Sequence, residues 1–214
     1  MRRLLLAFGL VFLASMALSA GPTLTPGKPA SRWAIKTSVV NSKLAHPKKI
    51  DYGVLASMDA LNLTAAEKKS FRDKRLPNDM SGFHEGDIVR VTGYLQVVAQ
   101  EADGDFHVQL TSKKTGATEC IVVEIPNPDK AFVADEKLRG LVQTPRDFIV
   151  TRLLKSKQPG SGGNVMIHPP YVTVTGQLFY DGFHQGEKRG THHMTASSLW
   201  ELHPVTKIAF APLP

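Results

Sequence analysis

Hydrophobic and polar positions alternate along much of the chain after residue 86, and this pattern predicts β-strands. In the first such stretch Val89, Val91, Leu95 and Val97 fall on one side, which is the two-residue period of a half-buried strand. Later stretches are bounded by turn residues or prolines, as strands commonly are. The predicted strands are 87–99, 106–110, 120–125, 171–180 and 199–210.

A different period separates the third predicted strand from the fourth. Apolar residues recur at helical spacing across 129–154, where Pro145 divides or kinks the helix. Three strands, a helix and two strands is the chain order of the OB barrel. Gly93 and Gly176 lie mid-strand in a repeated Val-Thr-Gly pattern and allow the coiling that closes such a barrel. We therefore predict a mainly β fold, a five-stranded OB-type barrel (β-β-β-α-β-β) over 86–211, with a generic antiparallel sheet as the alternative.

The first residues have the pattern of a secretory signal. Two arginines precede an apolar run (4–13), and small residues follow (14–20). The run is too short to span a bilayer comfortably, although an uncleaved anchor remains the alternative. We predict a signal peptide at 1–20, a linker rich in proline and glycine at 21–31, and a bacterial protein exported to the periplasm or the cell exterior.

Between the linker and the barrel, residues 32–85 form a predicted N-terminal extension. Alternation at 33–40 favours a peripheral strand, and Thr64 with Glu67 forms a capping box that opens a short polar helix ending before Pro77. The sequence leaves open whether this extension caps the barrel or is a separate arm.

The chain is basic, with a formal net charge of +7 that falls to +5 without the two arginines of the signal. The cations are scattered in pairs, which suits plain solubility or weak attraction to a polyanion. Four of them lie in predicted loops and are candidate binding residues: Lys113, Lys114, Lys188 and Arg189. The single cysteine, Cys120, excludes an internal disulfide and begins an apolar strand, so we expect it to be buried.

Acidic and histidine residues gather at the predicted ends of the fourth and fifth strands. Glu201 and His203 are two apart and share a face of one strand, while Asp181 and His184 lie where the neighbouring strand ends. Two carboxylates and two imidazoles can bind zinc or manganese, which would activate water for hydrolysis. The alternatives are a structural pair of His203 with Asp181 or Glu201, and direct acid–base catalysis.

We also expect His107 and Glu124, in the second and third predicted strands, to contact the ligands of such a site without binding the metal themselves. No glycine loop for phosphate, nucleophile elbow or Cys-x-x-Cys pair is present. Aromatic stacking platforms on these strands are also lacking, since Phe106 shares a face with apolar neighbours and belongs to the core.

Four segments of the C-terminal half resemble a group of bacterial exported proteins of unknown function. They are Asp-Phe-His-Val at 105–108, Val-Glu-Ile-Pro at 123–126, Val-Thr-Gly-Gln-Leu-Phe-Tyr-Asp at 174–181 and Trp-Glu-Leu-His-Pro-Val at 200–205. The resemblance covers about residues 86 to 210, and the Glu-x-His-Pro segment is its most specific part. It implies an exported β-rich domain and supplies no catalytic residues.

These observations favour an exported, non-enzymatic binding or structural domain that needs no cofactor. Its loops at 111–119 and 181–198 would face a protein or polyanionic partner. The first alternative is a metal-dependent hydrolase, for example of phosphodiesters or nucleic acid, that uses the Asp/His/Glu/His cluster. The second is a non-specific binder of polyanions or nucleic acid.

Overall fold

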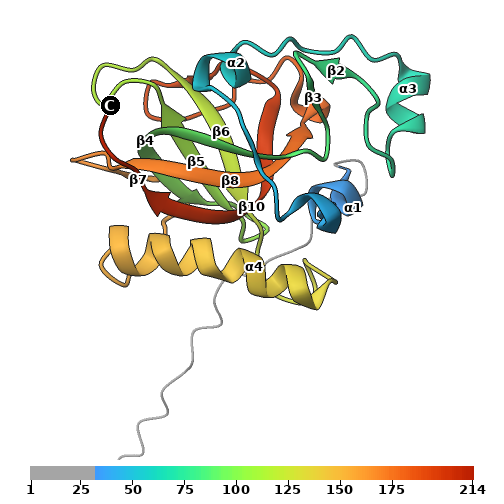
Figure 1. Cartoon of the computed structure of the whole chain (residues 1–214). Helices are drawn as coiled ribbons and strands as arrows, with labels where there is room; N and C mark the ends of the chain where they lie inside the picture. The colour runs from blue at the N-terminus through green and yellow to red at the C-terminus, as the bar shows by residue number, and fades with distance from the viewer. Residues whose placement is uncertain (1–31) are drawn as a thin grey trace, which may run out of the picture.

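The computed structural model describes residues 32–214 (Figure 1). The expected signal peptide and linker lie outside the described residues. Five long strands form a closed barrel in the order β4–β5–β6–β10–β8, and β8 pairs again with β4. They are β4 (Ile88–Gln100), β5 (Phe106–Thr111), β6 (Glu119–Ile125), β8 (Tyr171–Tyr180) and β10 (Trp200–Phe210).

All neighbouring barrel strands are antiparallel except β6 and β10, which are parallel. With α4 between β6 and β8, this is the topology of the OB barrel, so the predicted fold class is confirmed. The remaining barrel-side elements are short: α4 (Glu136–Asp147), η3 (Phe148–Leu153), β7 (Asn164–Val165), η4 (Gly182–His184) and β9 (Thr195–Ala196).

Alternation places the apolar side chains of every barrel strand in one core, with one exception to the predicted pattern. Val89, Val91 and Leu95 are buried there as expected. Val97 is not, because the register of β4 against β5 shifts between Leu95 and Val97. A bulge of this kind moves the following side chains to the opposite face, so Val98 enters the core and Val97 joins Cys120 in a small second cluster.

One end of the barrel is closed by α4, which lies across it in Figure 1. Asp135 caps the helix by accepting a hydrogen bond from the backbone N–H of Leu138 at 2.7 Å. Pro145 lies inside the helix, which continues into the wider turn η3 and does not divide into two separate helices. Arg146 donates to two carbonyls at the end of β6 and covers the Phe106 ring at 3.5 Å.

The N-terminal extension runs along the outside of the barrel (Figure 1). Its elements are α1 (Trp33–Lys36), η2 (Asn41–Lys43), β1 (Lys48–Lys49), α2 (Tyr52–Ala56), α3 (Ala65–Ser70), β2 (Asp79–Met80) and β3 (Phe83–His84). The capping box that opens α3 is confirmed, with both of its hydrogen bonds present.

The strand expected at 33–40 is wrong, because the chain makes a single helical turn there. Within residues 32–214 no strand pairs with this segment, and side-chain contacts hold it instead. Trp33 donates to the carbonyl of Phe132, and Arg32 forms a two-pronged ion pair with buried Glu85 at 2.6 and 2.7 Å. The extension is therefore fastened to the barrel and is not a separate arm.

No helix among residues 32–214 is long and apolar enough to cross a membrane. With one cysteine in the chain, no internal disulfide can form. Cys120 is buried, and burial raises the pKa of its thiol to about 12.

Candidate ligand-binding cleft

A cleft of about 540 Å³ opens at the end of the barrel, beside the end of β4. Its rim comes from the end of β4 and the start of the β4–β5 connection (99–102), and from the loop after β8 (187–191). Its floor includes His107 of β5 and Glu124 of β6, which are opposite each other in the sheet. This is the part of an OB barrel, above its second and third strands and between two loops, where ligands commonly bind.

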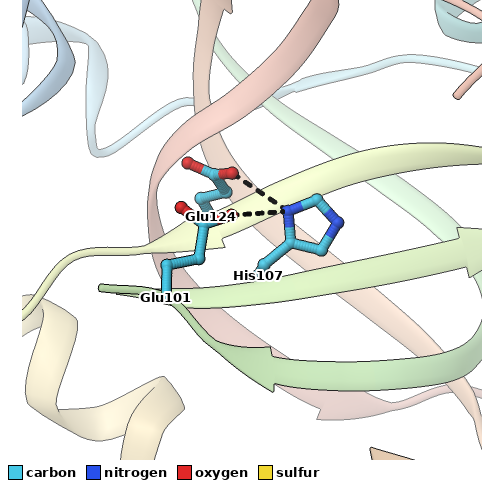
Figure 2. Close-up of side chains that lie close together, drawn as sticks. All are labelled: Glu101, His107 and Glu124. Carbon is cyan, nitrogen blue, oxygen red and sulfur yellow. Dashed lines mark hydrogen bonds and ion pairs between the residues drawn. The ribbon is translucent and has the colours of Figure 1, made fainter. Parts of the chain in front are cut away.

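At the centre of the floor, His107 lies between two carboxylates, as Figure 2 shows. Its Nδ1 is 3.1 Å from Glu124 Oε1 and 3.3 Å from Glu101 Oε1. Burial by itself lowers the pKa of His107, but the hydrogen bonds to Glu101 and Glu124 outweigh burial and raise it to about 10. His107 is therefore an imidazolium at neutral pH; it donates its Nδ1 proton to Glu124 and forms a second ion pair with Glu101.

Behind this triad lies a second, largely buried group that contains Lys36 of the extension. The Lys36 ammonium is 2.8 Å from Glu124 Oε2 and 3.8 Å from Asp105 Oδ2. His203 Nε2 is 3.2 Å from Asp105 Oδ2 and 3.5 Å from Glu124 Oε2, while its Nδ1 donates to the Lys36 carbonyl at 2.7 Å. The extension thus supplies both a charge and an acceptor to this group.

The charges of this buried group set one another's protonation. Burial raises the pKa of Glu124, but Lys36 and the hydrogen bond from His107 outweigh burial and hold it well below its usual range. Burial likewise lowers the pKa of Lys36, and Glu124 and Asp105 reverse this and raise it well above its usual value. Glu124 and Lys36 are therefore a stable buried ion pair.

A third group, built on Arg189, forms the opposite wall. Its guanidinium makes a direct ion pair with Glu201 and lies 3.4 Å from Asp181 Oδ2. His184 donates to the same Asp181 oxygen at 2.6 Å, and this bond raises the pKa of His184. The other oxygen of Glu201, Oε1, is buried without a hydrogen-bond partner in the described part of the chain.

The four residues expected to converge are therefore divided between two groups. Asp181, His184 and Glu201 gather around Arg189, whereas His203 faces Asp105 and Glu124. Glu201 and His203 do point to one face of β10, as their spacing predicts, but each finds a different partner. His107 and Glu124, expected in a supporting position, occupy the centre of the cleft floor.

Of the four candidate basic residues, only Lys188 and Arg189 line the cleft. Lys188 is exposed, whereas Arg189 is held in its ion pairs. Lys113 and Lys114 lie in the exposed turn after β5, outside the cleft. Both are exposed, and their carbonyls accept hydrogen bonds from Gln96.

Sequence reasoning missed Lys36, Glu101 and Asp105. Lys36 lies in the segment 33–40, where the predicted strand does not form. Glu101 and Asp105 flank a tight turn, and polar residues beside such turns are normally solvated. The one available signal was position, because the β4–β5 connection of an OB barrel borders its usual binding face.

Two sets of ligand atoms in the described residues are close enough to hold a metal ion: Glu101–His107–Glu124 and Asp105–Glu124–His203. In the second set the Lys36 ammonium already supplies the positive charge, so the residues present do not fit a further cation. The first set borders the cleft, and its N–O separations are close to the roughly 3.3 Å expected between tetrahedral zinc ligands. A metal there must displace the proton of His107.

Comparison with models of known protein families gives no match, and comparison with curated proteins finds no relative. The resemblance to exported proteins of unknown function stays a prediction.

Proposed function

We propose that the chain is an exported, non-enzymatic binding module that takes a polar, hydroxyl-rich ligand such as an oligosaccharide in this cleft. The observation that carries the proposal is the charge balance of the cleft floor, where each cation is paired with carboxylates. Lys36, His107 and Arg189 each face carboxylates across the cleft floor or wall. A strongly charged ligand would meet both signs there, whereas a hydroxyl group can donate to the carboxylates and accept from the cations.

Size and position support the same ligand class. A cleft of about 540 Å³ falls within the range of small-molecule sites, and OB barrels use this region for oligosaccharides and oligonucleotides. Among the described residues that line the cleft there is no phenylalanine, tyrosine or tryptophan, so it offers none of these rings for base stacking. The buried Cys120 thiol is unreactive at neutral pH, so it is not a catalytic nucleophile, and this supports a binding function.

The test is a titration of the isotopically labelled protein with a panel of soluble oligosaccharides, followed by NMR. We expect the amide signals of 99–102 and 187–191 to shift, and Glu101→Gln to weaken binding by at least about fivefold, since it removes one charged hydrogen-bond acceptor. Lys113→Ala, outside the cleft, is the matched control and should bind as the wild type does. The proposal would be contradicted if no oligosaccharide of the panel shifted any amide signal at millimolar concentration, or if the shifts were confined to other surfaces.

A metal-dependent hydrolase is the second candidate, and the spacing of Glu101, His107 and Glu124 favours it. These residues would hold zinc or manganese, which supplies a water activated for attack on a phosphodiester. Metal content and metal-dependent thermal shift at pH 8 test it. Stoichiometric metal that is lost in His107→Gln and retained in His184→Ala supports a hydrolase, and an unchanged melting temperature with zinc or manganese argues against it.

A further inference from the structure

The outward face of β4, β8 and β10, away from the cleft, carries side chains in three ordered rows. The register of these strands places residues of β4 and β10 on either side of their partners in β8. In the basic row, Arg90 and Lys207 lie on either side of Thr175; in the next row, which has small side chains, Thr92 and Ala209 lie on either side of Thr173; the aromatic row pairs Tyr94 with Tyr171. Residues within each row point to the same side because they are directly paired, and the rows are two residues apart along each strand.

The basic row opens into a groove of about 790 Å³ between these strands, the start of α4 and the extension. Arg90 and Lys207 are exposed, and Lys137 of α4 joins them. In the described residues, none of these three side chains forms an ion pair, and no carboxylate lines the groove. By contrast, Lys43 and Lys48 nearby share the carboxylate of Asp87. Unpaired cations in a groove without acids attract an anionic ligand.

The aromatic row adds a second kind of contact. Tyr94 and Tyr171 are both partly exposed, and their ring centroids are 4.7 Å apart. Phe210, which lines the groove, is 52% exposed. Aromatic faces beside a cationic groove are the combination that binds single-stranded nucleic acid, since bases stack on the rings while the cations follow the phosphates. An anionic polysaccharide would use the cations but gain less from the rings.

We propose that this outer face binds single-stranded nucleic acid, with phosphates at Arg90 and Lys207 and bases on Tyr94 and Tyr171. Arg90 and Tyr94 are four residues apart in β4, about 13 Å along the strand. A ligand reaching both rows must therefore be an extended strand of several nucleotides and not a single nucleotide. The site is separate from the cleft, where the described lining includes no phenylalanine, tyrosine or tryptophan and the cations of the floor are ion-paired.

The experiment measures fluorescence anisotropy of a labelled 12-nucleotide oligo(dT) at several salt concentrations. We expect binding at low salt that weakens as salt rises, and at least a tenfold loss in the double variant Arg90→Ala, Lys207→Ala. The slope of log affinity against log salt should fall by about 1.4, because two phosphate contacts are removed. Lys113→Ala, Lys114→Ala removes the same charge elsewhere and should bind within twofold of the wild type.

Tyr171→Leu separates nucleic acid from other polyanions. We expect it to weaken oligo(dT) binding by roughly fivefold or more, since one stacking partner is lost, and to leave weak binding of dextran sulfate unchanged. Three results would overturn the proposal: no oligo(dT) binding at 20 mM salt, equal losses in the two double variants, or dextran sulfate binding as tightly as oligo(dT) with no effect of Tyr171→Leu. Circular dichroism confirms that each variant is folded.

Discussion

Replacing Lys36 by methionine tests the buried charge network most directly. Methionine keeps an unbranched apolar side chain of similar length and removes only the ammonium. In the native protein this ammonium is 2.8 Å from Glu124 and 3.8 Å from Asp105, and it is 14% exposed. Lys36→Met therefore leaves two buried carboxylates with His107 and His203 as their remaining partners.

Removing one partner of a buried ion pair costs about 3–5 kcal/mol, because the other charge stays buried without compensation. His107 still compensates part of the charge of Glu124, so we expect a loss of about 3 kcal/mol in the free energy of unfolding at pH 7.5. For a protein of this size that loss lowers Tm by roughly 6–12 °C.

The loss should depend on pH in a defined direction. In the wild type the pKa of Glu124 is held well below its usual 4.5, so Glu124 contributes stability at neutral pH that is lost as pH falls through its folded pKa. Without Lys36 the folded pKa of Glu124 rises, and the carboxyl can be protonated in the variant under mildly acidic conditions. The stability difference between variant and wild type should therefore shrink between pH 7.5 and pH 4.5.

Urea unfolding followed by circular dichroism at both pH values is the assay. Lys188→Met is the matched control, because Lys188 lines the same cleft but is exposed, and its loss should cost no more than about 0.5 kcal/mol. Adding Glu124→Gln to Lys36→Met should restore part of the lost stability. Equal unfolding curves for Lys36→Met and Lys188→Met at both pH values would refute the reasoning.

Three further predictions concern other parts of the molecule. Glu85→Ala leaves the buried Arg32 unpaired and removes the acceptor of two backbone N–H groups, so urea unfolding should show a loss of about 3–5 kcal/mol; a loss under 1 kcal/mol would contradict it. Burial raises the pKa of Asp87, but hydrogen bonds from two lysines outweigh burial and lower the pKa to about 2. The Asp87 carboxylate contributes at most about 2 kcal/mol to the free energy of unfolding, because both lysines are half-exposed; this contribution is present above about pH 4 and is lost as pH falls through 2. The Tm difference between wild type and Asp87→Asn should therefore narrow from pH 7 to pH 3. Cys120 should resist iodoacetamide at pH 8 in the native protein and react fully in urea, as measured by mass spectrometry.

The barrel was predictable from the sequence because its strands carry a local signal. Two-residue alternation, turn residues and the change to helical spacing after 129 depend only on neighbours in the chain. The predictions that are wrong concern segments whose structure depends on residues far away in the chain. The bulge that turns Val97 out of the core depends on how β4 meets β5, and the helical turn at Trp33–Lys36 depends on a distant partner, Glu85.

The candidate site was predictable only in part, for the same reason. The shared face of Glu201 and His203 follows from strand geometry and is present. Their partners do not follow from it, since His203 bonds to Asp105 across 98 residues and to the Lys36 carbonyl across 167. A sequence pattern shows which side chains share an element, but the choice among several acids and bases at one barrel end is made by tertiary packing.

The two surfaces proposed for binding differ in whether their cations are ion-paired, and this difference allows an experiment to distinguish binding at one surface from binding at the other. In the cleft the buried cations Lys36, His107 and Arg189 already have anionic partners, so a ligand gains little from long-range attraction and must compete by shape and hydrogen bonds. On the outer face Arg90 and Lys207 have no such partners, so binding releases counterions and weakens steeply with salt. Raising the salt concentration from 50 to 300 mM should therefore weaken oligonucleotide binding on the outer face by about tenfold or more, while leaving saccharide binding in the cleft nearly unchanged. If both activities respond to salt in the same way, a single surface binds both ligands and the division argued from the ion pairs is incorrect.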